Sequence, residues 1–177
     1  MERIIVPMGY MGSGSSAITD LVSEFKDCQN EFKSYEYVLL HCPNGLFDLE
    51  DKLLIGNNAI RSDEAIRSFE TQMKKLYNKK FWWVGNYQKI IGPNFMRITE
   101  EYINRIQQFN FPGYWYTHEE VDTKMFIKLL LRKPIKMLTR NKVSFNKVLK
   151  YSDGMRISYI TSEKFYEESY KYIYDII

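Results

Sequence analysis

The feature that most constrains this fold is a glycine- and serine-rich loop that lies between a β-branched run and a helical pattern. Residues 3–8 read Arg-Ile-Ile-Val-Pro-Met, and residues 9–16 contain three glycines and three serines. The apolar residues that follow recur with helical spacing, at Ile18, Leu21, Val22 and Phe25. This order predicts a strand, a tight loop and a helix over residues 15–26, whose apolar side should pack on a sheet.

A loop of this kind is suited to bind a phosphate or a sulfate. The first N–H groups of a helix lack intrahelical partners, and the helix dipole leaves partial positive charge there. Glycines let the backbone approach a ligand closely, and serine hydroxyls add donors. We therefore expect an oxyanion site at this loop. The alternative is a glycine–serine turn that caps the helix and binds nothing.

Two nucleotide-binding motifs can be compared with the loop. Gly9 and Gly14, followed by Ser15 and Ser16, have the spacing of a Walker A motif. However, Ser15 stands in place of the lysine that reaches the β- and γ-phosphates, which argues against an ordinary ATPase or GTPase. The dinucleotide fingerprint fits less well, because Ala17 stands at its third glycine and no acidic residue follows convincingly at a second strand end.

Residues 12–16, Gly-Ser-Gly-Ser-Ser, resemble the 5′-phosphosulfate-binding loop of sulfotransferases that use PAPS (3′-phosphoadenosine 5′-phosphosulfate), which typically reads K/R-S-G-T-T. Residues 17–25 are similar to the first helix of bacterial sulfotransferase-like proteins often found with surface-polysaccharide genes. The resemblance covers about the first 25 residues. The PAPS-binding residues that it implies are Met11, Gly12, Ser13, Gly14, Ser15 and Ser16.

The resemblance implies an enzyme that transfers a sulfonyl group from PAPS to a carbohydrate hydroxyl. From the cysteine content and the basic segment at residues 124–150, both described below, we expect a cytoplasmic protein that is peripheral at the inner membrane face. Gly12 stands where the family has a basic residue, so backbone amides and hydroxyls, or a basic residue from elsewhere, must hold the sulfonate. Sulfotransferases place their 3′-phosphate contacts on later elements and generally run longer. The resemblance therefore implies a short or truncated member.

The rest of the chain predicts an α/β, three-layer P-loop fold in one domain of residues 1–177. Residues 36–41 form an almost continuous apolar run, typical of a parallel strand that is covered on both faces. A third strand is expected at residues 155–160, with a helix after it from Ser162. We expect a small parallel sheet of residues 4–8, 37–41 and 156–160, with a largely helical insertion at about 43–150 that forms the acceptor side.

The two histidines are the candidate general bases. His41 ends the second predicted strand, and ligands of open α/β sheets bind outside the carboxyl ends of the strands. A neutral imidazole at His41 would then take the proton of the acceptor hydroxyl. The alternative is a hydrogen-bonded histidine at a strand end. His118 is the weaker candidate, because its position at an apparent helix start suits a capping or solvent-facing residue.

The insertion should contain several amphipathic helices. We expect a break at residues 56–58, an N-cap at Ser62, a further helix over residues 94–109 and a loop over residues 111–116. The aromatic cluster at residues 81–87 favours a core, with a sugar-binding wall as the alternative. The apolar faces expected in the core consist of Leu46, Leu49, Leu53 and Leu54, and of Ala65, Ile66, Phe69, Met73 and Leu76.

Residues 124–150 carry nine positive charges and no acid, whereas the whole chain carries +3, so the remainder carries −6. Apolar residues lie among the first of these charges. Such a segment suits peripheral contact with an anionic membrane, a cleft for a nucleotide or an anionic glycan, or an ordinary helix whose lysine heads stay in water. No RNA- or DNA-binding signature is present.

Two functions therefore compete with the sulfotransferase. One is a P-loop phosphotransferase or NTPase that uses a lysine of residues 124–150, and the other is a non-catalytic anion- or membrane-binding protein.

The cysteine content and the hydropathy of the chain limit the cellular compartments and the kinds of site that can be expected. Cys28 and Cys42 form no disulfide framework and suit a reduced cytosol. Together with His41 and His118 they lie at unrelated spacing, so no metal site is predicted. No run of 18 apolar residues exists, and the first residues read as the charged start of a strand and not as a signal peptide.

Overall fold

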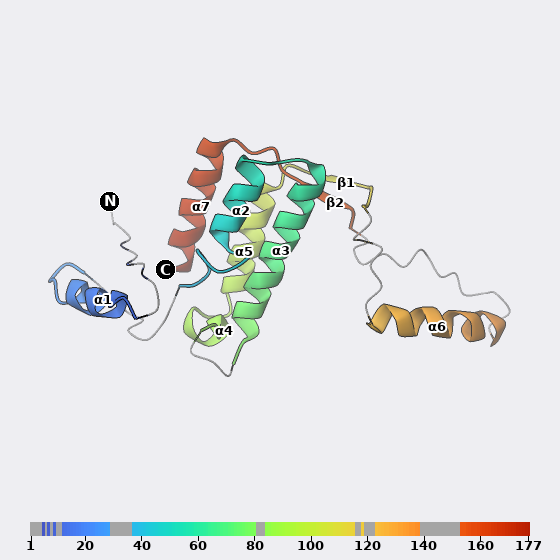
Figure 1. The fold of residues 1–177 in the computed structure, drawn as a ribbon, viewed down its shortest axis with the longest axis horizontal. Coiled ribbons are helices and arrows are strands. Elements are labelled where there is room, and N and C mark those ends of the chain that lie inside the picture. Colours follow the sequence, from blue (N-terminus) through green and yellow to red (C-terminus); the bar gives the residue numbers. More distant parts are fainter. Residues whose placement is uncertain are drawn as a thin grey trace.

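The computed structural model describes residues 5, 7, 9, 12–28, 37–80, 84–115, 118, 123–138 and 153–177 (Figure 1). Its elements, in chain order, are α1 (Ser15–Ser23), α2 (Leu46–Leu54), α3 (Ala59–Asn78), α4 (Tyr87–Ile90), α5 (Phe95–Ile106), β1 (Phe109–Phe111), α6 (Thr123–Leu138), β2 (Met155–Ile157) and α7 (Ser162–Ile176). The fold is mixed α and β, and mostly helical.

Four helices form the body of the molecule. α2 packs on α3, α3 on α5, α5 on α7, and α7 on α2, so the contacts close a ring (Figure 1). Each of these helices repeats apolar residues every three to four positions, and in a bundle those faces are buried together. The sequence therefore predicted the core faces of α2 and α3 correctly: Leu46, Leu49, Leu53, Ala65, Ile66, Phe69, Met73 and Leu76 are buried, and Leu54 packs against them partly buried.

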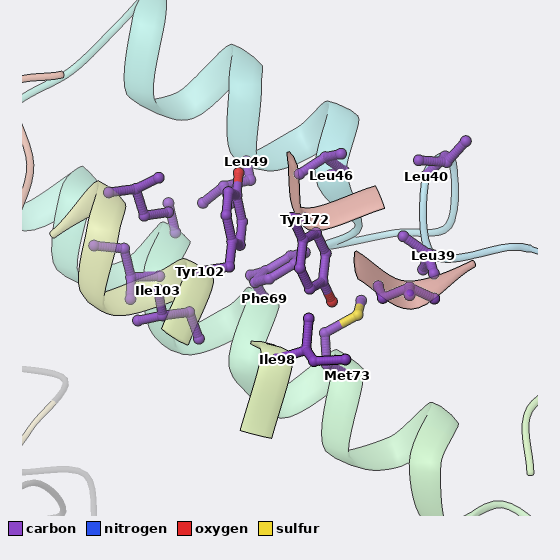
Figure 2. Close-up of a cluster of buried hydrophobic side chains, with 14 of the residues drawn as sticks. Leu39, Leu40, Leu46, Leu49, Phe69, Met73, Ile98, Tyr102, Ile103 and Tyr172 are labelled. Carbon is purple, nitrogen blue, oxygen red and sulfur yellow. The ribbon is translucent and has the colours of Figure 1, made fainter. Parts of the chain in front are cut away.

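The centre of the core is aromatic (Figure 2). The Phe69 ring meets the Tyr102 ring edge-on at a centroid distance of 5.8 Å, and the Tyr102 and Tyr172 rings stack at 4.4 Å. The hydroxyls of Tyr102 and Tyr172 each have a partner, as buried tyrosines usually require. The Tyr102 hydroxyl lies 2.8 Å from Ser169 Oγ, and the Tyr172 hydroxyl lies 2.9 Å from Thr99 Oγ1.

The helix boundaries follow from their caps. The predicted break at residues 56–58 is confirmed, but the predicted N-cap at Ser62 is wrong. α3 begins at Ala59, because the Asn58 side chain accepts hydrogen bonds from the N–H groups of Ile60 and Arg61 at 3.0 Å each. Ser62 instead lies inside α3, where its hydroxyl accepts a hydrogen bond from the Ser158 N–H at 2.7 Å.

The strands differ from the prediction. β1 and β2 pair antiparallel, with Phe109 opposite Ile157 and Phe111 opposite Met155, so the strand near residues 156–160 does not belong to a parallel sheet. Ile5 and Pro7, the two described residues of the predicted strand at 4–8, are not in a strand. The three-layer parallel arrangement is therefore not found in the described part of the chain.

The predicted strand at residues 37–41 is a turn. Val38, Leu39 and Leu40 are buried in the core of the bundle (Figure 2 labels Leu39 and Leu40). The carbonyl groups of Leu39 and Leu40 accept hydrogen bonds from the N–H groups of Leu46 and Phe47 at 2.9 Å each. The run therefore leads into the first turn of α2. A short apolar run cannot by itself distinguish a strand from another buried segment.

α1 and α6 lie apart from the four packed helices (Figure 1). α1 begins where the sequence predicted a helix, but none of its nine residues is buried. Ile18, Leu21 and Phe25 are exposed, so the prediction that this face packs on a sheet is wrong. The expected aromatic cluster falls partly outside the described residues, at 81–83, and its last member, Tyr87, is fully buried in the core.

Candidate functional site

The glycine–serine loop enters α1 through two residues with left-handed backbone conformation. Gly12 has φ 78° and Gly14 has φ 84°, values that only glycine adopts readily. Gly14 is the N-cap residue of α1 and supplies no side-chain cap. The first N–H groups of α1 therefore lack both an intrahelical partner and a cap from this residue. The predicted loop and helix start are confirmed.

The surroundings of the loop are open on one side and tight on the other. A Cβ atom added at Gly12 or Gly14 would meet nothing within 4 Å. A Cβ atom at Gly9 would collide with the side chain of Ser13 and would touch Ser15, so the loop curves back over Gly9. Gly12, Ser13, Gly14 and Ser16 are exposed, and Ser15 is half-buried. Met11, the remaining predicted PAPS-binding residue, lies outside the described residues.

The predicted base His41 lies on the turn that precedes α2. Its N–H donates a hydrogen bond to the Val38 carbonyl at 3.2 Å, and its side chain is exposed. The prediction placed His41 beside the loop because both would lie at the carboxyl edge of one parallel sheet. That sheet edge is not formed, and α1 makes no extensive contact with any other described helix or strand. The role of His41 therefore stays a prediction without the support of the sheet.

A charged residue that the sequence did not single out, Asp63 of α3, accepts four hydrogen bonds. Its Oδ1 accepts hydrogen bonds from Arg67 Nε at 2.8 Å and from the Arg156 N–H at 2.9 Å. Its Oδ2 lies 2.9 Å from Trp115 Nε1 and 2.7 Å from His118 Nε2. Asp63 thus joins α3 to β2 and to the segment after β1.

Further ion pairs extend this cluster toward the surface. Arg67 also bonds to Asp153 Oδ1 at 3.1 Å, and Arg156 Nη1 lies 2.6 Å from Glu70 Oε2. We name the seven residues the Asp63 cluster: Asp63, Arg67, Glu70, Trp115, His118, Asp153 and Arg156.

The environment of Asp63 favours its ionised form. Burial alone would raise the pKa of this carboxyl. The hydrogen bonds from the Arg156 N–H, Trp115 and His118, with the charge of Arg67, outweigh burial and hold the pKa below its usual value. Because the pKa is lowered, Asp63 is a poor proton acceptor at neutral pH.

The Asp63 cluster has a structural role. The side chains of Asp63 and His118 are each 1% exposed, so a substrate has no access to the pair in this conformation. The solvent-facing alternative for His118 is therefore wrong, and the helix start that it was expected to cap, at residues 119–122, lies outside the described residues. One sequence signal was available, the four-residue spacing of Asp63 and Arg67, which places both on one side of a helix. The partners in β2 and after β1 are 52 to 93 residues away, and no local pattern links them.

The two cysteines are free thiols. Burial raises the pKa of the Cys42 thiol above its usual value, which does not favour a reactive thiolate. Within the described residues, no group of three or more His, Cys, Asp or Glu side chains is arranged to hold a metal ion. No described helix combines the length and the apolar character needed to cross a membrane.

The comparisons with known proteins identify no relative. No protein family model matches the chain, and neither the curated proteins nor the solved structures contain a significant match.

Proposed function

We propose that the chain binds the phosphosulfate group of PAPS at residues 11–16 and transfers its sulfonyl group to a carbohydrate hydroxyl. The observation that supports this proposal is the left-handed backbone at Gly12 and Gly14 directly before α1. Left-handed glycines ahead of a helix N-terminus are typical of loops whose N–H groups bind an anion, and the open space at both glycines leaves room for one. The proposal keeps the loop-and-helix unit of a P-loop protein and does not need the three-layer sheet.

Sulfonyl transfer breaks the bond from sulfur to the bridging phosphate oxygen and forms a bond from sulfur to the acceptor oxygen. Negative charge develops on the group held by the loop, and preorganised N–H donors stabilise such charge. The hydroxyls of Ser13, Ser15 and Ser16 add donors where the related loops carry a cation. His41 is the proposed base that takes the proton of the acceptor hydroxyl, and the phosphate leaves with the electron pair as 3′-phosphoadenosine 5′-phosphate.

Direct binding measurement tests the first half of the proposal. Because α1 makes no extensive contact with the bundle, a ligand at the loop need not change the melting temperature, so isothermal titration calorimetry is the suitable method. We expect binding of PAPS and of 3′-phosphoadenosine 5′-phosphate. Binding of ATP–Mg alone would instead indicate the phosphotransferase or NTPase. If none of the three binds, the loop is only a helix cap and the proposal is wrong.

A matched pair of glycine variants tests the site. Gly14→Ala and Gly92→Ala both place a Cβ on a residue with positive φ, and neither Cβ meets an atom within 4 Å. Both variants therefore place alanine in a backbone conformation that favours glycine, but only Gly14 belongs to the loop. We expect Gly14→Ala to weaken PAPS binding about tenfold or more, because the backbone must approach the ligand there. Gly92→Ala should bind as the parent chain does; equal effects of the two variants would contradict the assignment.

The role of His41 is tested separately. His41→Gln should leave PAPS binding unchanged and lower the rate of sulfonyl transfer to a mixture of oligosaccharide acceptors about 10²- to 10⁴-fold. The control is Lys89→Gln, which changes another exposed residue and should leave the rate unchanged. His118→Gln is unsuitable as a control, because His118 is buried and holds the fold. An unchanged rate in His41→Gln would remove His41 from the mechanism and leave the binding proposal intact.

A further inference from the structure

α6 carries an unusual combination of charge and exposed apolar surface. Its sixteen residues contain five Lys or Arg and no Asp or Glu. Six of its apolar side chains are at least half exposed: Phe126 55%, Ile127 52%, Leu130 61%, Leu131 50%, Met137 87% and Leu138 83%. Isolated exposed apolar residues are common on proteins, but a contiguous group of this kind marks an interaction surface.

The exposed apolar residues and four of the five basic residues lie on different sides of the helix; the fifth basic position, 133, falls at the edge of the apolar arc beside position 126. At 3.6 residues per turn, positions 126, 130 and 137 and positions 127, 131 and 138 fall within one arc. Positions 124, 128, 132 and 136, all basic, follow one another at four-residue spacing along the other side. α6 is therefore an amphipathic helix with a broad apolar side and a basic line.

The apolar side of α6 is not covered by the described part of the protein. α6 makes no extensive contact with another described helix or strand, and Figure 1 shows it apart from the bundle formed by α2, α3, α5 and α7. This arrangement differs from α3, where the apolar face is buried in the core.

We propose that α6 binds in the plane of an anionic lipid surface, with its apolar side in the headgroup–acyl boundary and its basic residues against the lipid phosphates. The charge argues for this partner, because residues 124–150 carry nine positive charges while the remainder of the chain carries −6. Lysine and arginine side chains reach from a buried apolar stem to the headgroups. A nucleic acid would use the basic line only and would leave Met137 and Leu138 in water. The proposal does not depend on PAPS binding.

Co-sedimentation of the full chain with vesicles tests the proposal. One vesicle preparation contains phosphatidylcholine alone, and the other contains phosphatidylcholine mixed with phosphatidylglycerol. We expect partitioning to be about tenfold or more in favour of the anionic vesicles, and to weaken as salt is raised. Equal partitioning into both preparations, or none into either, would overturn the proposal.

Two double variants separate the apolar and the basic contributions. Phe126→Ser with Leu130→Ser removes apolar surface, and Lys124→Gln with Arg132→Gln removes two charges. Each should reduce binding to anionic vesicles about tenfold or more. The controls make the same number of changes at exposed residues elsewhere: Ile55→Ser with Ile177→Ser for the apolar pair, and Lys75→Gln with Lys171→Gln for the charged pair.

The controls should bind as the parent chain does, and all variants should keep its unfolding midpoint, since the substituted residues lie outside the core. If the basic variant loses binding but the apolar variant does not, and duplex RNA or heparin competes, α6 is a polyanion-binding surface and the lipid proposal is wrong. If an acidic protein binds α6 and vesicles do not, the proposal is equally wrong.

Discussion

Asp63 Oδ2 lies 2.7 Å from His118 Nε2, and this contact joins two buried residues that are 55 positions apart in the chain. Around it, one carboxylate fixes α3, β2 and the segment after β1 to each other. A buried charge is tolerated only when it is paired and hydrogen-bonded. Asp63 meets this condition with four partners, so the pair stabilises the fold.

Removal of the Asp63 charge should strongly destabilise the protein. Asp63→Asn keeps the shape of the side chain but leaves the buried Arg67 guanidinium without its nearest anion. Breaking a buried pair completely costs about 3–5 kcal/mol, and the remaining pair of Arg67 with Asp153 sets the loss toward the lower end of that range. Urea denaturation followed by circular dichroism measures the loss. The control is Glu101→Gln, which breaks the exposed pair with Arg97 and should cost less than about 1 kcal/mol. Similar losses in both variants would contradict the structural role of Asp63.

Stability should fall in acid. Burial by itself would raise the pKa values of Asp63, Glu70 and Asp153, but their hydrogen bonds and the nearby cations lower all three. A lowered pKa in the folded state means that folding favours the ionised form. The stabilisation is therefore complete above the unfolded pKa values of about 3.9 for Asp and 4.3 for Glu. It is lost as the pH falls through the lower values of the folded state.

A series of urea midpoints between neutral pH and about pH 3 measures this effect. The parent chain should lose stability below about pH 4, and Asp63→Asn should show a shallower decline because one of the three groups is gone. A parent midpoint that stays constant down to pH 3 would exclude this coupling.

The start of α3 offers a prediction about a helix cap. Asn58→Ala removes the acceptor for two N–H groups and should cost about 0.5–2 kcal/mol, whereas Asn58→Asp should be close to neutral. Asn58→Gly should cost only a few tenths of a kcal/mol, because glycine is tolerated at an N-cap. Thermal unfolding of the three variants gives the order. If Asn58→Asp destabilises as much as Asn58→Ala, the side chain does not act as the cap.

The helices were predictable where periodicity alone decides burial. Phe69 and Met73 of α3 are one helical turn apart, as are Leu49 and Leu53 of α2, and all four are buried in the bundle. The same spacing gave the wrong environment for Ile18 and Phe25, because periodicity shows which side of a helix is apolar but not what covers it. Strands were harder, since residues 38–40 have the composition of a buried strand and are buried as a turn.

The candidate site was predictable only in its local part. The loop of residues 12–16 depends on glycine chemistry and helix entry, both of which a sequence displays directly. The predicted position of His41 depended on a sheet topology that is not found in the described residues. The buried position of His118 depends on Asp63, which lies 55 residues away in the chain. Long-range partners of this kind are set by the packing of the whole bundle, which no local motif records.

The two buried tyrosines should differ in the cost of losing a hydroxyl. Thr99 Oγ1 donates its single proton to the Phe95 carbonyl at 2.8 Å, so it accepts from Tyr172 and keeps a partner in Tyr172→Phe. Tyr172→Phe should therefore cost about 1 kcal/mol, whereas Tyr102→Phe removes the partner of the buried Ser169 hydroxyl and should cost about 1–3 kcal/mol.

A double-mutant cycle makes the Tyr102–Ser169 bond measurable. Ser169→Ala leaves the Tyr102 hydroxyl buried without that bond, and Tyr102→Phe leaves the Ser169 hydroxyl without it. When both are replaced, no unpaired polar group remains at this place, so the double variant should cost less than the sum of the single variants by about 0.5–3 kcal/mol. Urea denaturation of the four proteins gives the coupling free energy. Strictly additive losses would mean that the two hydroxyls do not interact, and that α5 and α7 are held together by ring packing and by the Thr99–Tyr172 and Arg105–Glu168 contacts.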